Sequence, residues 1–496
     1  SGNVNSDFSV GGALAVTGTS TLTGSLAVTG DYSSTTSGTS NLRLGVNAGN
    51  SIASGGNYNV TIGDEAGTAL TTGDDNVAIG YAALDAEDTG SKSIAIGTNA
   101  LTAQNNDSNN YNIAIGHSAG LAITSGVRNV VIGGNALDAN TTGSKSVAIG
   151  YATLGAQNPA TATDMYNVAV GYEAGNAVTT GTDNTLIGAV SGDALTTGER
   201  NVTLGYHALG GDVAGNQTVA IGFAALSSQN FSTSTISYNT AVGYVAGSSV
   251  TTGQYNTFVG NASGDAVTDA DENVAVGYNS LSSNTLGNRT VAIGTGALRD
   301  MNFTTATDSF NTAVGLSAGL SATTAQYSTF IGGAAGDAIT TANSNVAVGY
   351  NSLSTETTGA NSTALGTSAL ATQNVGSGVN VANTAVGYDA GYAVTTGVQN
   401  TIVGAYAGDA LTTGESNVAL GYGALSSDDV GNHSVAIGHG ALFTQNYATS
   451  TDSNNTAVGY NCGNAVTTGV QNTFVGAFAG DGTDDGNYNT ALGYGA

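Results

Sequence analysis

Asn76-Val77-Ala78-Ile79-Gly80 is one copy of a phrase that the chain repeats 26 times in 496 residues. Each copy has Asn, Ser or Thr, then two or three small or branched residues, an aliphatic residue and a glycine. Successive glycines are mostly 17 residues apart, and a longer interval of 21 recurs. This period is too short for a helical repeat or a propeller blade and is typical of one coil of a β-solenoid. We therefore predict an all-β solenoid of about 26 stacked coils.

The coils form a second level of repetition. From Gly171 onward the intervals run 17, 17, 17 and 21, so that four coils make a unit of 72 residues. Each coil of the unit has its own sequence, and we refer to coils of the first, second, third and fourth type. The examples begin at Asn167, Asn184, Asn201 and Thr218. The unit near Asn112 lacks one coil, a loss that a stacked array tolerates because each coil contacts only its neighbours.

The alternation of side chains along a strand predicts two faces for each phrase. Residues one and three before the glycine lie on one face and are aliphatic or Thr. The residue two before it lies on the other face and is Ala in most coils, but large and apolar in second-type coils. A coil of two short strands and turns is too thin to bury both faces, so we expect the second face to contact another chain in a homotrimer. The expected packing residues are Leu186, Phe258, Phe330, Ile402 and Phe474.

The solenoid accounts for residues 41–496. At about 4.8 Å per coil, its 26 coils make a rod roughly 120 Å long. The sequence stops in the middle of a coil at Ala496, so we expect the native protein to continue or to be processed near this point. Residues 1–40 carry a hexapeptide pattern over 13–18, 19–24 and 25–30. Three chains can wind such a pattern into a β-prism stem.

Composition and charge exclude several classes of protein. With 75 Gly, one Pro and no Trp, the chain has the composition of a repetitive β rod. Seven basic and 34 acidic residues give a formal net charge of −27, which repels nucleic acid and anionic membranes and favours only loose binding of divalent cations. No stretch approaches the ~20 apolar residues of a membrane span. The single cysteine, Cys462, stands where other coils have Ala, and we expect it to be inert packing.

Catalytic chemistry has little support in the sequence, and we predict no catalytic, metal-binding or cofactor-binding residues. The Asp193 column repeats every 72 residues, or about 19 Å along the rod, whereas paired glycosidase carboxylates lie roughly 5 to 9.5 Å apart. The four histidines show no spacing of a triad or zinc site. No phosphate-binding or dinucleotide fingerprint is present. A polysaccharide-degrading tailspike is the only enzymatic alternative.

The tails of the fourth-type coils are the candidate recognition surface. They bulge at regular intervals and vary in sequence, and variable loops on a rigid scaffold commonly carry recognition. Solvated decoration is the alternative. The candidate residues are Gln157, Asn158, Tyr166, Gln229, Phe231, Tyr238, Phe303, Phe310, Gln445 and Tyr447. Tyrosines directly after the glycine, such as Tyr81, are better explained by packing within or between chains than by sugar binding. The Thr-Thr-Gly segments favour a turn over an ice-binding array.

Two families resemble these phrases. Ser-Val-Ala-Ile-Gly at 146–150 and 434–438 resembles the head repeat of trimeric autotransporter adhesins, which implies left-handed β-rolls in a homotrimer. Asn-Thr-Ala-Val-Gly-Tyr at 239–244 and 455–460 is similar to repeats of bacteriophage tail fibres, where a Leu-x-Val-Thr-Gly stem commonly precedes them. The resemblance covers residues 41–496, and the longer coils and the 72-residue order depart from the usual adhesin head. Together with the hexapeptide stem, it favours the phage-type fibre.

These observations predict a non-enzymatic, extracellular, trimeric fibre on a virion or bacterial surface. Such a fibre acts as a shaft and as an adhesion element. Its expected partners are two further copies of the chain and a cell-surface glycan or protein receptor, with no nucleic acid and no membrane insertion. A bacterial trimeric adhesin and a self-assembling extracellular filament are the main alternatives, and a tailspike or an ice-binding protein are minor ones.

Overall fold

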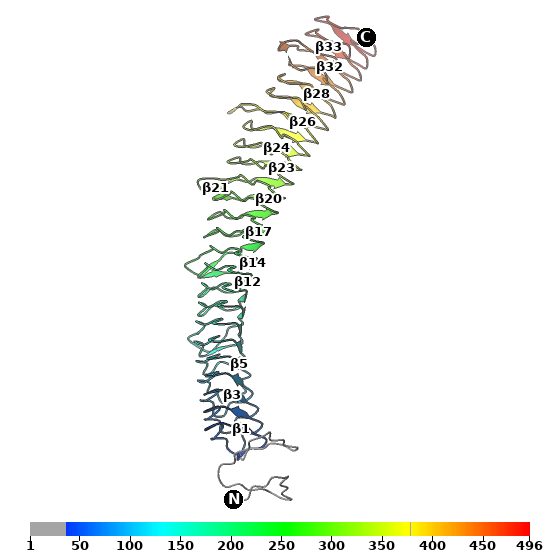
Figure 1. Cartoon of the computed structure of the whole chain (residues 1–496). Coiled ribbons are helices and arrows are strands. Elements are labelled where there is room, and N and C mark those ends of the chain that lie inside the picture. Colours follow the sequence, from blue (N-terminus) through cyan, green and yellow to red (C-terminus); the bar gives the residue numbers. More distant parts are fainter. Residues whose placement is uncertain (1–35, 377) are drawn as a thin grey trace, which may run out of the picture.

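The computed structural model describes residues 36–376 and 378–496, and the predicted all-β solenoid is confirmed there. Within these residues there is no helix, and 26 three-residue strands form one parallel sheet in which neighbouring strands follow one another along the chain. Figure 1 shows the coils stacked into a long, gently curved rod with the first and last coils at opposite ends. The predicted stem lies outside the described residues, apart from its last five positions.

The strands of the main sheet are short and regularly spaced. In order along the rod they are β1 (Leu42–Leu44), β2 (Val60–Ile62), β3 (Val77–Ile79), β4 (Ile94–Ile96), β5 (Ile113–Ile115), β6 (Val130–Ile132), β8 (Val147–Ile149), β10 (Val168–Val170), β11 (Thr185–Ile187), β12 (Val202–Leu204), β14 (Val219–Ile221), β16 (Thr240–Val242), β17 (Thr257–Val259), β18 (Val274–Val276), β20 (Val291–Ile293), β22 (Thr312–Val314), β23 (Thr329–Ile331), β24 (Val346–Val348), β25 (Thr363–Leu365), β26 (Thr384–Val386), β27 (Thr401–Val403), β28 (Val418–Leu420), β30 (Val435–Ile437), β32 (Thr456–Val458), β33 (Thr473–Val475) and β34 (Thr490–Leu492).

Eight two-residue strands form four small parallel pairs beside the main sheet. The pairs are β7 (Gly143–Ser144) with β9 (Thr163–Asp164), β13 (Gly215–Asn216) with β15 (Thr235–Ile236), β19 (Gly287–Asn288) with β21 (Thr307–Asp308), and β29 (Gly431–Asn432) with β31 (Thr451–Asp452). Most coils therefore contain one strand, whereas we expected two short strands in each coil from the sequence. The rest of each coil consists of turns whose N–H groups donate to carbonyl groups of adjacent coils, as Gly175 N does to Ser191 O at 3.0 Å.

The glycine that ends each strand sets the distance between coils. All 26 of these glycines have φ between +124° and +149°, a region that side chains other than glycine rarely adopt. A Cβ at Gly260 would lie 2.5 Å from the carbonyl oxygen of Gly277, which holds the same position one coil later. The glycine column is therefore required both by the backbone conformation and by the close approach of the next coil.

A buried ladder of amides locks each coil to the next. Asn184 Nδ2 donates to Gly198 O at 2.8 Å and so closes the turn of its own coil. Its Oδ1 accepts a hydrogen bond from the backbone N–H of Asn201, one coil later, at 3.0 Å. Both asparagines are fully buried. Asn201 repeats both bonds, donating to Gly215 O and accepting from the Thr218 backbone N–H, each at 2.9 Å, so this column combines turn capping with stacking.

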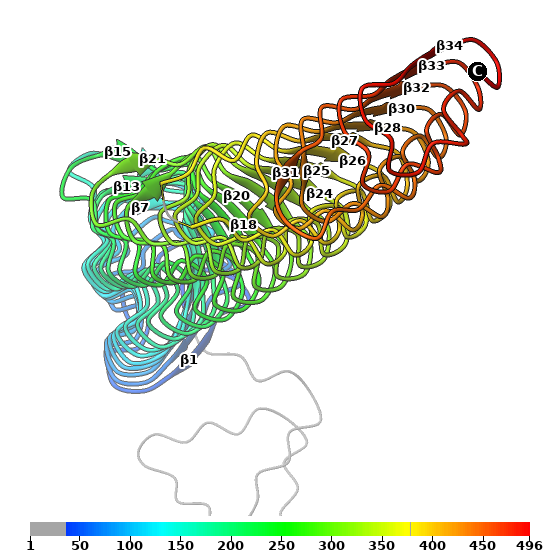
Figure 2. The ribbon, with the colours of Figure 1, turned by 90° about the horizontal axis from the view of Figure 1, so that it is seen from above.

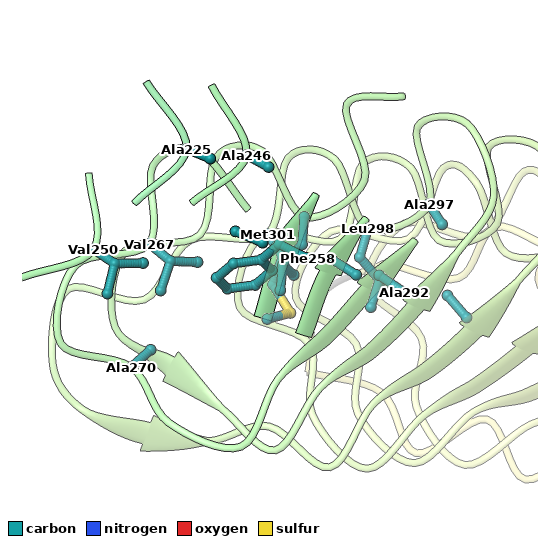
Figure 3. Packing of buried hydrophobic residues seen from close by; sticks show 14 of the residues in the cluster. Ala225, Ala246, Val250, Phe258, Val267, Ala270, Ala292, Ala297, Leu298 and Met301 are labelled. Carbon is teal, nitrogen blue, oxygen red and sulfur yellow. The ribbon is translucent and has the colours of Figure 1, made fainter. Parts of the chain in front are cut away.

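The large residues of the second-type coils point into the interior of their own coil, which corrects the predicted trimer packing. Within a single chain Leu186, Phe258, Phe330 and Ile402 are 0% exposed and Phe474 is 1% exposed, so no second chain can contact these side chains. The assumption that a coil is too thin to bury them was wrong because small residues line the facing wall. Figure 3 shows Phe258 surrounded by interior side chains, among them Ala246, Val250 and Val267.

A second set of glycines makes room for these large residues. Gly247 and Gly264 each stand four residues after a strand-ending glycine, and both have a φ of +59°. A Cβ on Gly247 would lie 2.8 Å from the Phe258 ring, and one on Gly264 would lie 2.5 Å from it. In third- and fourth-type coils the same position holds a buried leucine, such as Leu281. The interior is thus filled alternately from opposite walls, at the density typical of protein cores.

The outer face of the sheet is formed by the residues one and three before each glycine. These Val, Ile, Leu and Thr side chains are half-buried or exposed, and Ile331 is 39% exposed while its neighbour Phe330 is fully buried. We call this surface the outer sheet face. It is an apolar strip that runs the length of the rod, and a single chain leaves it uncovered.

Gly260→Ala tests the glycine column. The substituted chain should lose about 2 to 4 kcal/mol of local stability, because the added Cβ combines a strained φ with a clash against Gly277. In a repeat array this loss is confined to nearby coils, so amide hydrogen exchange should accelerate in the coils next to Gly260 and remain slow far from it. Gly482→Ala is the control, since no atom lies within 4 Å of the added Cβ. Equal exchange in both variants would contradict this account.

Candidate recognition surface

The extra residues of the fourth-type coils form bulges that return to the rod through the short strand pairs. In each of the four pairs, the second strand belongs to the bulge and adds in parallel to a strand of the preceding third-to-fourth-type turn. Figure 2 shows β7, β13, β15 and β21 gathered on the same side of the rod. The bulges at 104–111 and 373–382 return through single bridges, Ser91 to Asn109 and Ala360 to Asn380. The bulges are therefore anchored extensions of the solenoid.

A glutamine under each of four bulges organises a buried network of hydrogen bonds. Gln229 Nε2 donates to Asp212 Oδ2 at 2.7 Å and to Thr218 Oγ1 at 3.1 Å. Gln229 Oε1 accepts a hydrogen bond from Asn239 Nδ2 at 2.8 Å. The same arrangement recurs at Gln104, Gln373 and Gln445. The network explains why fourth-type coils begin with Ser or Thr, because a short hydroxyl leaves space for the glutamine amide.

The buried carboxylate in this network holds the base of the bulge. Asp212 is fully buried, and its Oδ1 accepts hydrogen bonds at 3.1 Å from both the Gly215 and the Phe231 backbone N–H. Within the described residues no cation pairs with it. Burial raises the pKa of Asp212, and the hydrogen bond from Gln229 opposes this rise without cancelling it. Burial likewise raises the pKa of Glu87 and of Asp428, which hold the equivalent position in other units.

Six of the ten predicted recognition residues are buried, which corrects their assignment. Gln157, Gln229 and Gln445 are 0% exposed, and Phe231, Phe303 and Tyr447 are between 4% and 5% exposed. The first three belong to the interior hydrogen-bond network. Tyr447 donates to Gly469 O at 2.8 Å, and the two phenylalanines pack beneath their bulges. The segments that vary in sequence thus include interior residues, which sequence spacing alone does not separate from the surface.

The other four predicted residues are at the surface. Tyr166, Tyr238 and Phe310 are each about half exposed, and Asn158 is exposed while its Oδ1 accepts a hydrogen bond from the Thr141 hydroxyl at 2.8 Å. Each aromatic ring closes its bulge. In the four bulges that carry strand pairs, three small residues at the tip are exposed. These tips are 160–162, 232–234, 304–306 and 448–450.

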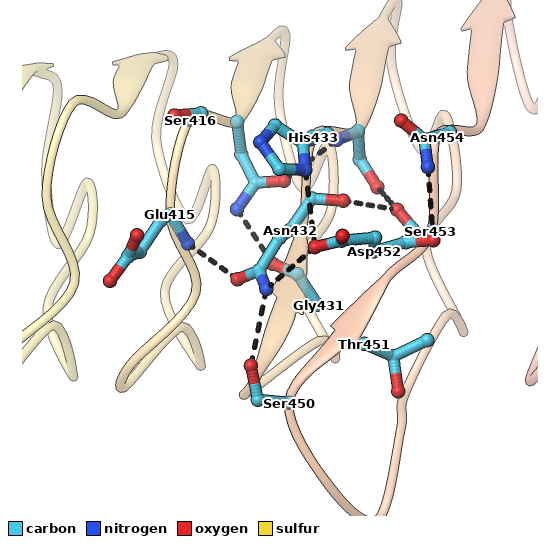
Figure 4. A network of polar contacts seen from close by, with 12 residues as sticks. Glu415, Ser416, Gly431, Asn432, His433, Ser450, Thr451, Asp452, Ser453 and Asn454 are labelled. Atoms are coloured by element: carbon cyan, nitrogen blue, oxygen red, sulfur yellow. Dashed lines mark hydrogen bonds and ion pairs between the residues drawn. The ribbon is translucent and has the colours of Figure 1, made fainter.

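An ion pair fastens some of the bulges to the preceding coil. Lys145 Nζ lies 2.6 Å from Asp164 Oδ2 and 4.9 Å from the centre of the Tyr166 ring. Arg289 pairs with Asp308 in the same way, two units further along. Figure 4 shows the equivalent contact of His433 with Asp452, at 3.3 Å.

Figure 4 also shows Asn432 donating to Ser450 and to Asp452, at 3.1 and 3.3 Å. The amide of Asn432 thus links β29 to the bulge that carries β31. Together with the ion pairs, these contacts hold the bulges in a fixed relation to the rod.

The aromatic residues that follow the strand-ending glycines stack on one another. The Phe223 ring lies 5.4 Å from that of Tyr206 and 5.2 Å from that of Tyr244, with interplanar angles of 16° and 14°. His439 is stacked between Tyr422 and Tyr460 in the same column, 5.2 Å from each. Packing within the chain, the role predicted for these rings, is therefore confirmed, although about half of each Tyr surface remains exposed.

Two further sequence predictions agree with the geometry. The first threonine of the turn donates to a carbonyl of the next coil, as Thr179 Oγ1 does to Thr196 O at 3.1 Å, which is a turn-stabilising role. Cys462 is buried, its thiol donates to Phe474 O at 3.2 Å, and burial raises its pKa. The buried acid and glutamine pairs were missed by the sequence interpretation. The signal was present, since an acidic residue seven positions after the glycine is followed by Gln 17 residues later.

Comparison with known proteins supplies no family. A scan against protein-family models finds no match, and a search of curated proteins finds no significant relative. Within residues 36–376 and 378–496, no group of three or more His, Cys, Asp or Glu side chains is arranged to hold a metal ion. In the same part of the chain, no helix is long and apolar enough to cross a membrane.

The buried carboxylates predict an unusual dependence of stability on pH. A carboxyl group whose pKa is raised by folding binds protons more tightly in the native than in the unfolded chain. The free energy of unfolding should therefore fall as the pH rises from about 4, the unfolded pKa, through the raised folded pKa of Asp212 and Asp428. We expect a double variant, Asp212→Asn with Asp428→Asn, to show a smaller drop in thermal midpoint between pH 4 and pH 7.5 than the parent.

The fold should tolerate both substitutions, because Asn140 and Asn284 hold the same interior position in other units. Their side-chain oxygens accept hydrogen bonds from the backbone N–H groups of Gly143 and Gly287. Asp107→Asn is the control for loss of an exposed charge. Identical pH profiles for the parent and the double variant would contradict the prediction, because they would show that ionisation of Asp212 and Asp428 does not lower the stability of the fold.

Proposed function

We propose that this chain is a section of a rigid extracellular fibre that assembles as a homotrimer and presents its bulges to a cell surface. The observation that carries the proposal is the unbroken parallel sheet, in which every coil from β1 to β34 pairs with the next. At about 4.8 Å per coil the 26 strands make a rod roughly 120 Å long, with no internal hinge in the pairing. Such a structure extends a binding element away from its point of attachment.

The outer sheet face supports assembly with further copies. Along this face Leu204 is 47% exposed and Leu365 and Leu420 are each 43% exposed, and the stacked Tyr column continues the apolar strip. Continuous apolar strips of this length mark interaction surfaces in soluble proteins. The proposed interface is therefore the outer sheet face, on the opposite side of the strands from the large interior residues that were predicted from the sequence to form it. Three copies is the number suggested by the hexapeptide pattern of residues 13–30 and by the resemblance to trimeric fibres.

A bacteriophage tail fibre is the form of this proposal that the sequence favours, because that family places a Leu-x-Val-Thr-Gly stem before such coils. A bacterial trimeric adhesin is the second candidate and draws on the Ser-Val-Ala-Ile-Gly phrases. Both functions place the rod outside the cell and need no catalytic residue. In both, the partner is a cell-surface glycan or protein receptor. A neighbouring gene for a structural virion protein selects the first, and a membrane-anchor domain in the same reading frame selects the second.

Substitutions at adjacent residues test the interface, because Phe330 and Ile331 point to opposite sides of β23. Light scattering of the parent should return three times 48.3 kDa. A triple variant with Ile293→Glu, Ile331→Glu and Leu365→Glu should return about one chain mass with an unchanged circular dichroism spectrum, since only outer-face side chains change. Phe330→Asp should instead disrupt its coil, because the carboxylate enters the interior. A monomeric parent, or a triple variant that remains trimeric, would overturn this part of the proposal.

A further inference from the structure

Five of the seven basic residues of this acidic chain occupy a single column. The column holds the residue five positions before each strand-ending glycine, and we call it the pre-strand column. Since it contains 26 of 496 residues, an even distribution would place fewer than one basic residue in it. Its basic members are Lys92, Arg128, Lys145, Arg200 and Arg289.

The backbone presents this column as a regular ladder. All 26 of its residues have φ between +49° and +67°, which turns each side chain outward at the same point of the coil. Backbone hydrogen bonds fix the rungs, with Arg128 N donating to Asn110 O at 2.8 Å and Lys145 N to Val127 O at 3.0 Å. Successive side chains are therefore about 4.8 Å apart along the rod.

Five consecutive coils combine cations and aromatic rings in this ladder. The residues are Lys92, Tyr111, Arg128, Lys145 and Tyr166, and we call them the cation–aromatic patch. Lys92 Nζ lies 5.4 Å from the centre of the Tyr111 ring, and Lys145 Nζ lies 4.9 Å from that of Tyr166. Both tyrosines are about half exposed, and Arg128 is exposed between them. The patch spans four coil intervals, or about 19 Å.

The charges of the patch are only partly compensated. Lys145 is paired with Asp164, but among the described residues Arg128 and Lys92 form no ion pair with an acid. The same column carries Asp75 one coil before Lys92 and Asp183 one coil after Tyr166. The positive segment thus ends sharply on both sides, in a chain whose formal net charge is −27.

We propose that the cation–aromatic patch binds a short segment of an acidic polysaccharide. Extended sugar chains repeat on nearly the same length scale as the coils, so one sugar can lie over each rung. The exposed tyrosine faces suit the apolar faces of pyranose rings, and Arg128 and Lys92 suit the carboxylate or sulfate groups between them. This inference rests on the proposed extracellular function and names the class of surface ligand for one part of the rod.

Other anionic polymers fit the patch less well. A nucleic acid carries a phosphate on every nucleotide and would meet the acidic coils on both sides of the patch. A sugar chain with spaced acidic groups has to satisfy only the two or three cations present. In a trimer with cyclic symmetry the three patches lie at the same height on the rod, so that one multivalent polysaccharide layer can engage all of them.

The test compares the parent with a double variant, Lys92→Gln with Arg128→Gln. Glutamine occupies the same column at Gln217, Gln399 and Gln471 with the same positive φ, so the fold should be retained. The charge-matched control is Arg289→Gln with Arg299→Gln, since both arginines already have acidic partners elsewhere on the rod. The binding of each protein to immobilised hyaluronate, which carries a carboxylate on every second sugar, to sparsely sulfated dextran, to neutral dextran and to single-stranded DNA is measured at low and high salt.

The parent and the control should bind hyaluronate or sparsely sulfated dextran in a salt-sensitive manner, and the patch variant should bind about tenfold more weakly or worse. The preferred polymer tells whether the anionic group is a carboxylate or a sulfate. Unchanged binding in the patch variant, binding to neutral dextran alone, or preference for DNA would overturn the proposal. Light scattering on the same samples separates the two hypotheses, because an intact trimeric rod without polysaccharide binding refutes only this inference, whereas a monomer refutes the proposed assembly.

Discussion

The approach of one coil to the next is set by the glycine that ends every strand, and the rest of the structure depends on this distance. With φ near +130° and the next carbonyl oxygen within 2.1 to 2.7 Å of any added Cβ, almost every glycine of the column, as at Gly222 and Gly63, holds its neighbour at a separation that no other residue permits. At that separation the asparagine amide reaches both its own turn and the following backbone N–H. The same short spacing brings the exposed side chains of successive coils into stacking contact.

A narrow interior then forces the coils to share space. The Phe258 ring occupies the space that side chains at positions 247 and 264 would need, and both of these residues are glycine. In the following third-type coil, the equivalent position holds Leu281, whose buried side chain fills the interior from the opposite wall. The opposite wall of the third- and fourth-type coils is polar, with Asp212 and Gln229 bonded to each other and to the turn. Burying a carboxylate without a cation costs free energy, and the hydrogen bonds from backbone and amide groups offset that cost. These hydrogen bonds hold the base of the bulge in a fixed position.

The repeat, the coil number and the columns were predictable from sequence because they depend on spacing alone. Which face of each strand points into the coil could not be predicted from spacing. Alternation separates Phe330 from Ile331 but does not say which of them points inward, and both are apolar. The distinction depends on the residues of the opposite wall, where the glycine at 336 provides the space for Phe330. The buried Gln229 was placed on the surface for the same reason, since its partner Asp212 belongs to the preceding coil and is 17 residues away.

The division between inner and outer columns also decides where function can vary. Inner columns contact each other through the glycine spacing, so each residue is constrained by the coils beside it. Where Asn replaces the acid, the residue 17 positions later is Gln157 in one unit and the buried Met301 in another. The pre-strand column is free of this restriction. Its residues share one backbone conformation but no interior contact, and they range from Lys92 and Tyr111 to Ala382. A rod of this kind can therefore carry a ligand site of chosen length on a few coils while all the others serve as spacer.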